Sequence, residues 1–318
     1  MMTLDEIRLK ANPVLTNLLL GRGQGTMVAD RLFPRLPQSL STVTIAKMGD
    51  AARRRYNLRR APGTATKQIT INFEGKLYTV KQHAVEVPIP RELIRESDEA
   101  RKLNLAPNIG ISTVAMTTAR DVLNLDYEIE AAEFATDPSS FAPGHSKALA
   151  GTEKWSAPTG TPVTDILAAS NVIRKKVGRR PNKLMLSADA ETALISNAEV
   201  KSYLPSTQMG PATLEQLKTI LKVKEIVVGD ASYTDEDDEG HDVWGNAAVL
   251  AYAPDIPASG EFSLAEPAFG FTNVIEGHPF SETPVYREAQ KSWIYGGTFE
   301  RAPNIAYPDA GFLFLNPN

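Results

Sequence analysis

The residues that could catalyse a reaction or bind a metal are few in this chain and poorly spaced for either task. The four histidines, His83, His145, His241 and His278, are far apart, and none pairs with another at the spacing of a helical metal site. Cysteine is absent, so disulfides, thiolate metal sites and cysteine nucleophiles are excluded. No H-E-x-x-H, G-x-S-x-G or G-x-x-x-x-G-K-[ST] motif occurs. We therefore predict a protein that is not an enzyme and has no catalytic residue, metal or cofactor; an enzyme with an unrecognised site stays the alternative.

Two segments resemble binding loops only weakly. Residues 230–242 carry seven carboxylates and no lysine or arginine, and residues 235–240 resemble part of a calcium loop. The twelfth position of that loop is Asn246, where a bidentate glutamate is needed, so we interpret the segment as a solvated acidic turn. Residues 21–25, GRGQG, follow no predicted strand, so we interpret them as a flexible joint rather than a phosphate-binding loop.

The most unusual region is basic. Residues 47–67 contain seven lysines and arginines and a single acidic residue, Asp50. Beyond them, apolar and polar residues alternate with the period of a half-buried strand, residues 74–76 predict a turn, and residues 77–82 predict the returning strand. This hairpin has too few apolar residues to stabilise itself, so we predict that it rests on a neighbouring subunit. The predicted contact residues are Arg53, Arg54, Arg55, Arg59, Arg60, Ile69, Ile71 and Phe73.

The overall charge argues against a protein built to hold nucleic acid. The net charge is −4, and Tyr56 is the one aromatic residue among the arginines. A nucleic-acid-binding protein that uses the basic hairpin is nevertheless a second interpretation. No stretch is long and apolar enough to cross a membrane, and the first ten residues lack the apolar core of a signal peptide.

A long helix must organise the elements that carry these segments. Residues 108–135 predict one helix with an apolar stripe, and Asp137-Pro138 stops it. About 27 residues at ~1.5 Å each give a rod of roughly 40 Å. Such a helix needs a sheet to lie on, and we expect it to bury the stripe of Val114, Thr118, Val122, Leu125, Ile129 and Ala132.

The second half of the chain alternates between strands and helices. A helix is predicted from residue 164 to Val177 with Gly178 closing it, and Ser187 is expected to cap the helix after strand 183–187. Together with strands 225–229 and 247–253, these elements predict an α/β layer over residues 180–280. Strands are predicted again at 285–295 and 312–315.

The order of these elements and four local patterns resemble one family, the major capsid proteins of tailed bacteriophages with the Hong Kong 97 type fold. Residues 151–194 resemble the family's segment of Trp, Asp-Ile helix, Gly, Pro-Asn and strand. VKSYLP at 200–205 resembles the helix end that follows it. AAVLAYAPD at 247–255 resembles the late strand ending in Tyr-x-Pro, and RAPNIAYPDAGFLF at 301–314 resembles the terminal strand pair.

The resemblance implies an α+β fold with five parts. These are an N-terminal arm at 1–45, an extended β-hairpin loop at 46–90, a peripheral domain at 91–180 with a spine helix at 108–135, an axial domain at 181–280, and return strands to the peripheral domain at 281–318.

The resemblance also implies a function. The protein would be a structural major capsid protein that self-assembles through hexamers and pentamers into an icosahedral shell enclosing phage double-stranded DNA. Its partners would be itself, a portal, a separate scaffold, decoration proteins and packaged DNA without sequence specificity, with no membrane. It would be located in the virion after assembly in the host cytoplasm. The alternative is an encapsulin-like cellular compartment shell of the same fold.

Overall fold

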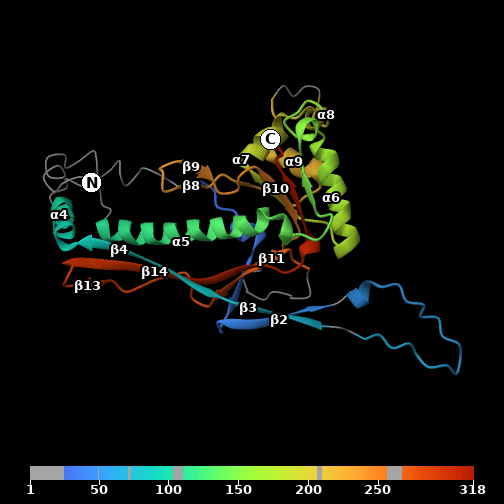
Figure 1. The fold of residues 1–318 in the computed structure, drawn as a ribbon, viewed down its shortest axis with the longest axis horizontal. Coiled ribbons are helices and arrows are strands. Elements are labelled where there is room, and N and C mark those ends of the chain that lie inside the picture. The colour runs from blue at the N-terminus through green and yellow to red at the C-terminus, as the bar shows by residue number, and fades with distance from the viewer. Residues whose placement is uncertain (1–24, 49, 71–72, 103–109, 206–209, 256–266) are drawn as a thin grey trace.

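Two β-sheets joined by a long helix make up the body of the protein (Figure 1). The computed structural model describes residues 25–48, 50–70, 73–102, 110–205, 210–255 and 267–318. Residues 1–24 of the predicted arm, and Ile71 of the predicted contact set, therefore lie outside the described residues.

The six-stranded sheet is built around one long strand, β14 (Ser292–Ile305). On one side, β14 pairs antiparallel with β4 (Lys81–Pro90) over ten residue pairs. Its other side pairs with β11 (Gly270–Ile275), β12 (Phe280–Ser281) and β13 (Val285–Arg287). The short strand β1 (Arg35–Gln38) is parallel to β11 and completes the sheet.

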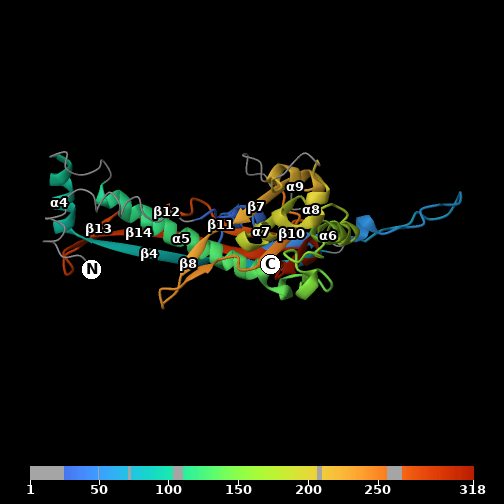
Figure 2. The same ribbon diagram turned by 90° about the horizontal axis from the view of Figure 1, so that it is seen from above.

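Helix α5 (Ile111–Thr136) lies lengthwise along this sheet, as Figures 1 and 2 both show. The prediction of one long helix is confirmed, and α4 (Arg91–Lys102) is a shorter helix before it. Most of the predicted stripe is wrong, because Val122 is 46% exposed and Thr118 is exposed too, whereas Ala132 is buried as predicted. The buried face is dominated by small side chains, which let the helix approach the sheet closely: Ala115, Ala119, Leu123, Tyr127, Glu128, Ala131, Ala132 and Ala135.

The five-stranded sheet forms the predicted α/β layer. Its strands are β5 (Ser146–Ala148), β15 (Gly311–Leu315), β10 (Ala247–Ala251), β6 (Lys183–Ser187) and β7 (Glu225–Gly229), in that order. Every residue of β6 and β10 is buried, which explains the continuous apolar runs at 184–186 and 247–251 within them. The associated helices are α6 (Pro162–Val177), α7 (Ala188–Ser196), α8 (Ala198–Ser202) and α9 (Leu214–Leu221).

The helix ends follow local capping chemistry. The Ser187 side chain accepts a hydrogen bond from the Ala190 N–H, as predicted, and Gly178 ends α6 at φ 83°. The start of α6 differs from the prediction, because Pro162 occupies its first turn. The Glu199 carboxylate, rather than a local residue, accepts hydrogen bonds from the backbone N–H groups of Val163 and Thr164.

A separate two-stranded ribbon consists of β2 (Thr42–Met48) and β3 (Phe73–Thr79). The predicted turn at residues 74–76 is wrong, because these residues lie inside β3 and pair with residues 45–47. Gly75 suits a strand here, since a Cβ at this position would lie 3.0 Å from Cγ2 of Thr44. The basic segment is therefore a longer loop between β2 and β3, and Ile69 belongs to that loop rather than to a strand.

Part of the N-terminal segment belongs to the hydrophobic core. Leu32 and Phe33, at the end of α3 (Ala29–Leu32), are fully buried, although they fall within the N-terminal arm expected at residues 1–45. Two oxygens of the buried Glu128 carboxylate accept hydrogen bonds from the N–H groups of Val28 and Ala29 and from the indole of Trp244. This one side chain on α5 therefore fixes the start of α3 and the segment before β10.

Two regions differ from the expected division of the chain. The last strand, β15, pairs with β10 in the five-stranded sheet, whereas β14 lies in the six-stranded sheet. Residues 281–318 were expected to return as a whole to the peripheral domain, but their strands divide between the two sheets. Within residues 91–180, β5 and α6 likewise belong with the five-stranded sheet, because β5 pairs with β15.

Candidate subunit-contact surfaces

The basic loop, residues 50–70, projects from the body at the end of the β2–β3 ribbon (Figure 1). The ribbon that carries the loop contacts the body through β3, since Nζ of Lys76 donates to the Ile305 carbonyl at 3.5 Å and the Tyr78 ring is buried. Within the part of the chain that the structure describes, the hydrogen bonds of residues 54–70 stay within the loop, from the Arg59 N–H to Asn57 and from Arg60 to Thr66. The loop therefore extends beyond the body that carries it.

The structure places most of the predicted contact residues on this loop. Arg54, Arg55, Arg59 and Arg60 are exposed. Two apolar side chains join them at the surface, Leu58 at 66% exposure and Ile69 at 44%. Phe73 begins β3, where it pairs with Met48. The exposed apolar and basic residues are thus brought together along one projecting segment.

Arg53 differs from the other predicted contact residues because it contacts its own chain. It lies in a short 3-10 turn, Asp50–Arg53, and its Nη2 donates to the backbone carbonyl of Lys175 at 2.9 Å. Its Nε also lies 3.1 Å from where a Cβ on Gly178 would be. Carbonyls in the last turn of a helix lack an intrahelical partner and favour a cation. Arg53 therefore anchors the start of the basic loop to the end of α6.

The end of α6 is itself strongly basic. Residues 171–182 contain five basic residues and no acidic one, and all five are exposed. The guanidinium of Arg179 donates to the hydroxyl of Tyr252 at 3.0 Å and lies over its ring. Because Arg53 contacts this helix end, two segments more than 100 residues apart form one basic patch. We define it as Arg53, Arg54, Arg55, Arg174, Lys175, Lys176, Arg179 and Arg180.

Sequence reasoning missed the α6 part of this patch. The run Arg174-Lys175-Lys176 at a helix end was visible, but it reads as ordinary compensation of the helix dipole. Only the contact between Arg53 and the Lys175 carbonyl joins it to the basic loop, and such a long-range contact leaves no pattern in the sequence.

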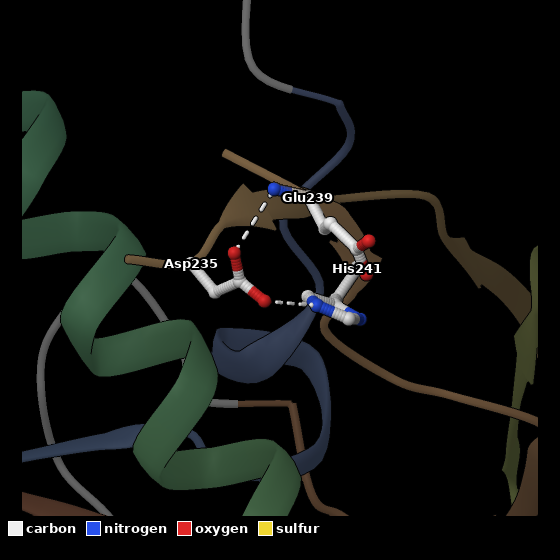
Figure 3. A group of neighbouring side chains, drawn as sticks. All are labelled: Asp235, Glu239 and His241. Atoms are coloured by element: carbon white, nitrogen blue, oxygen red, sulfur yellow. Dashed lines mark hydrogen bonds and ion pairs between the residues drawn. The ribbon is translucent and has the colours of Figure 1, made fainter. Parts of the chain in front are cut away.

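The acidic segment forms a small hairpin, β8 (Ser232–Thr234) and β9 (Gly240–Asp242). Figure 3 shows its tip, where Oδ1 of Asp235 accepts the Glu239 N–H at 2.9 Å and Oδ2 lies 2.6 Å from Nε2 of His241. The His241 hydrogen bond, followed by the Glu239 N–H, lowers the pKa of Asp235. The Asp235 carboxylate thus holds the turn, while its acidic neighbours Glu236, Asp237, Asp238 and Asp242 are exposed.

A buried charged cluster connects strands β4 and β14 of the six-stranded sheet to α5. The guanidinium of Arg301, on β14, is fully buried, and its Nη2 lies 2.6 Å from Asp126 and 3.4 Å from Glu130. His83 on β4 is 2.9 Å from the same Asp126 oxygen. Burial raises the pKa of Glu130, opposed mainly by the Arg301 charge. These contacts fix β4, which continues from the ribbon, against the helix.

None of the helices in the described parts of the chain is both long and apolar enough to span a bilayer.

Comparison with known proteins gives a consistent result. The family model for phage major capsid protein E matches residues 141–295. A major capsid protein from Burkholderia phage BcepMu is 30% identical over 316 residues, which cover 99% of each chain. The chain belongs to the family of phage major capsid proteins. It is therefore a structural component of a phage capsid, and it assembles with further copies of itself.

Solved structures support the fold. The crystal structure of a phage-related protein from Bordetella bronchiseptica matches with a TM-score of 0.72 at 31% identity, covering 96% of this chain and 97% of that one. The capsid structure of the cyanophage P-SCSP1u matches with a TM-score of 0.55 at 12% identity, covering 93% and 89%. The predicted Hong Kong 97 type capsid fold is confirmed.

The fold extends beyond phages. An encapsulin complex from Synechococcus elongatus matches with a TM-score of 0.53 at 12% identity, covering 96% and 95% of the two chains. At this identity the likeness concerns the fold alone. The phage interpretation has the closer sequence relatives, so the alternative of a cellular compartment shell is the less supported one.

Proposed function

We propose that this major capsid protein forms hexamers and pentamers that close into an icosahedral shell around double-stranded phage DNA. The observation that carries the proposal is the β2–β3 ribbon with its basic loop. It projects beyond its own body and exposes Leu58, Ile69 and four arginines there. Exposed apolar and charged residues on a projecting segment suit contact with a neighbouring copy.

The same proposal assigns parts to the chain. The six-stranded sheet with α4 and α5 would be the peripheral domain, and the five-stranded sheet with α6 to α9 would be the axial domain. The ribbon with its basic loop, which covers most of the expected segment 46–90, would be the extended loop that contacts an adjacent subunit, through Arg54, Arg55, Arg59, Arg60, Ile69, Ile71 and Phe73. The role is structural rather than catalytic.

The remaining partners follow from this role. A portal, a separate scaffold and decoration proteins would join the shell, and packaged DNA would contact its inner face without sequence specificity. Assembly would take place in the host cytoplasm before the protein is found in virions.

Electron microscopy of the expressed protein tests the proposal. We expect closed particles or capsomers of uniform size. A protein that stays monomeric over a wide range of concentration and ionic strength would contradict it. Particles filled with DNA in infected cells would support the phage role, whereas particles filled with protein cargo would favour the compartment alternative.

Reversing the loop charges tests the contact itself. We expect Arg54→Glu/Arg55→Glu/Arg59→Glu/Arg60→Glu to stop shell formation, because the variant loop would repel the acidic surface that it is proposed to meet. The subunit should stay folded, since these side chains are exposed. Circular dichroism and sedimentation velocity separate the two effects. Normal particles from this variant would contradict the contact.

A further inference from the structure

Two surfaces of opposite charge lie on different sides of the five-stranded sheet. Figures 1 and 2 both place α6 at one side of the five-stranded sheet and the β8–β9 hairpin toward the other. The basic patch surrounds the end of α6, and the acidic hairpin carries exposed carboxylates on and beside its tip. Because the sheet lies between them, the two surfaces do not neutralise each other within one chain.

The basic patch is an electrostatically unfavourable arrangement in an isolated subunit. Arg53 contacts the Lys175 carbonyl at 2.9 Å, which brings the first arginines of the basic loop to a helix end that already holds Arg174, Lys175 and Lys176. Like charges gathered in this way repel one another, and a partner that carries several negative charges relieves the repulsion. The patch thus suits an anionic partner with several charges spread over a short length.

The acidic hairpin has the matching chemistry. Four carboxylates, those of Glu236, Asp237, Asp238 and Glu239, are exposed in succession at its tip. The hydrogen bonds of Asp235 to backbone N–H groups and to His241 hold that turn in one conformation (Figure 3). A preformed turn loses less conformational freedom when it binds than a flexible acidic segment does.

Placement on different sides is what a ring of identical subunits needs. In a head-to-tail contact, one side of each copy binds the other side of the next copy. The copies form a closed ring when the rotation from one copy to the next adds up to one full turn. We propose that the acidic hairpin of one copy docks on the basic patch of the adjacent copy. This inference rests on the proposed assembly of the protein into capsomers and adds a specific pair of surfaces to it.

Charge swapping between two variants tests this contact. The patch variant is Lys175→Glu/Lys176→Glu, and the hairpin variant is Glu236→Lys/Asp237→Lys; all four side chains are exposed. Each variant alone places like charges at every contact, so we expect the yield of capsomers to fall at least about tenfold. In a mixture, alternating copies restore opposite charges at every contact of a hexamer, whose number of copies is even, so the equimolar mixture is expected to form hexamers.

The four substitutions combined in one chain give the same prediction, because both surfaces then exchange their sign together. Lys201→Glu is the matched control: it is also exposed in the last turn of a helix, α8, but lies outside the patch. We expect it to assemble like the wild type. Sedimentation velocity and electron microscopy give the yields, and thermal unfolding of each variant confirms that the fold is kept.

The outcomes separate this inference from the proposed function. Normal assembly of either single-surface variant, or failure of both the mixture and the combined variant, would overturn the contact while leaving shell formation intact. If the patch variant loses only retention of added DNA and the hairpin variant assembles normally, the patch binds nucleic acid and the inference is wrong. Wild-type protein that forms no particles would contradict the proposed function itself.

Discussion

The guanidinium of Arg53 combines two roles in one contact. It satisfies a carbonyl in the last turn of α6, and it fixes where the basic loop leaves the body. The neighbouring side chain of Arg54 is exposed. Two adjacent arginines of the same run therefore differ, because one positions the loop and the other is proposed to contact other copies.

We predict that Arg53→Ala loosens the start of the loop. A cation on a helix end is worth about 0.5–1 kcal/mol, so cleavage by chymotrypsin after Tyr56 or Leu58 should speed up about two- to fivefold. The matched control is Arg54→Ala, for which we expect an unchanged cleavage rate. Equal rates for the two variants would show that the contact with the Lys175 carbonyl does not hold the loop.

Glu128 predicts a specific pH dependence. Burial raises its pKa above the ordinary value of 4.5, although hydrogen bonds from Val28, Ala29 and Trp244 act in the opposite direction. The folded state therefore binds this proton more tightly than the unfolded state does. As the pH rises from about 4.5 through the higher folded pKa, Glu128 lowers the free energy of unfolding. Below that window both states are protonated, and the contribution no longer changes with pH.

The measurement compares urea unfolding of the wild type and Glu128→Gln between pH 4 and pH 8. We expect a flatter pH profile for the glutamine variant, because its side chain does not titrate. Glu128→Ala should lose several kcal/mol at every pH, since each buried donor left without an acceptor costs about 1–3 kcal/mol. Parallel profiles for the wild type and the glutamine variant would contradict the assignment of this pH dependence to Glu128.

At the level of elements, the close approach of α5 to the six-stranded sheet depends on alanine. The period of the helix was correct in the sequence, but its apolar stripe was placed on the larger residues. Leu125 and Ile129 are only partly buried, and Val122 faces solvent, whereas Ala131 is fully buried. Hydrophobicity ranks the larger residues higher, but the space between a helix and a closely packed sheet selects small ones.

We predict that Ala131→Leu destabilises the fold by about 1–3 kcal/mol through overpacking. A position on the exposed face of the same helix gives the control. Val122→Ser should shift the unfolding free energy by no more than about 0.5 kcal/mol, because this side chain is already half exposed. Chemical denaturation of both variants measures the difference. A neutral Ala131→Leu would mean that the helix can move away from the sheet without cost.

The ribbon shows a limit of local reasoning about strands. Alternation of apolar and polar residues indicated strand structure near residue 73, and that much is correct. The pattern cannot identify a partner strand, and here β3 pairs with β2, which is separated from it by the whole basic loop. By contrast, Ser187 and Gly178 were placed correctly, because a cap depends on residues within one turn.

For the whole molecule, the order of elements was sufficient to predict the fold class. The buried runs of β6 and β10 and the late strands occur in the family's sequence of elements, so the sheets could be anticipated. Only part of the proposed contact surfaces could be predicted from the sequence. The exposed arginines of the loop were visible as a charge run, but their union with the end of α6 exists only in three dimensions.

Replacing residues 50–70 by a short glycine-containing turn tests how separate the loop is from the core. We expect the unfolding free energy to change by less than about 1 kcal/mol, because the hydrogen bonds described for residues 54–70 stay within the loop and only the Arg53 anchor is lost. Particle formation should be abolished. A large loss of stability would show that the loop is part of the subunit core.

The continuity of β3 with β4 has a mechanical consequence. Only Val80 separates the two strands, so a neighbour that pulls on the ribbon transmits tension straight into β4. That strand is held to β14 by ten residue pairs whose hydrogen bonds run across the direction of the pull. The bonds are then strained together in shear rather than opened one after another, so the subunit can resist stretching of the shell at the place where the ribbon is proposed to contact its neighbour.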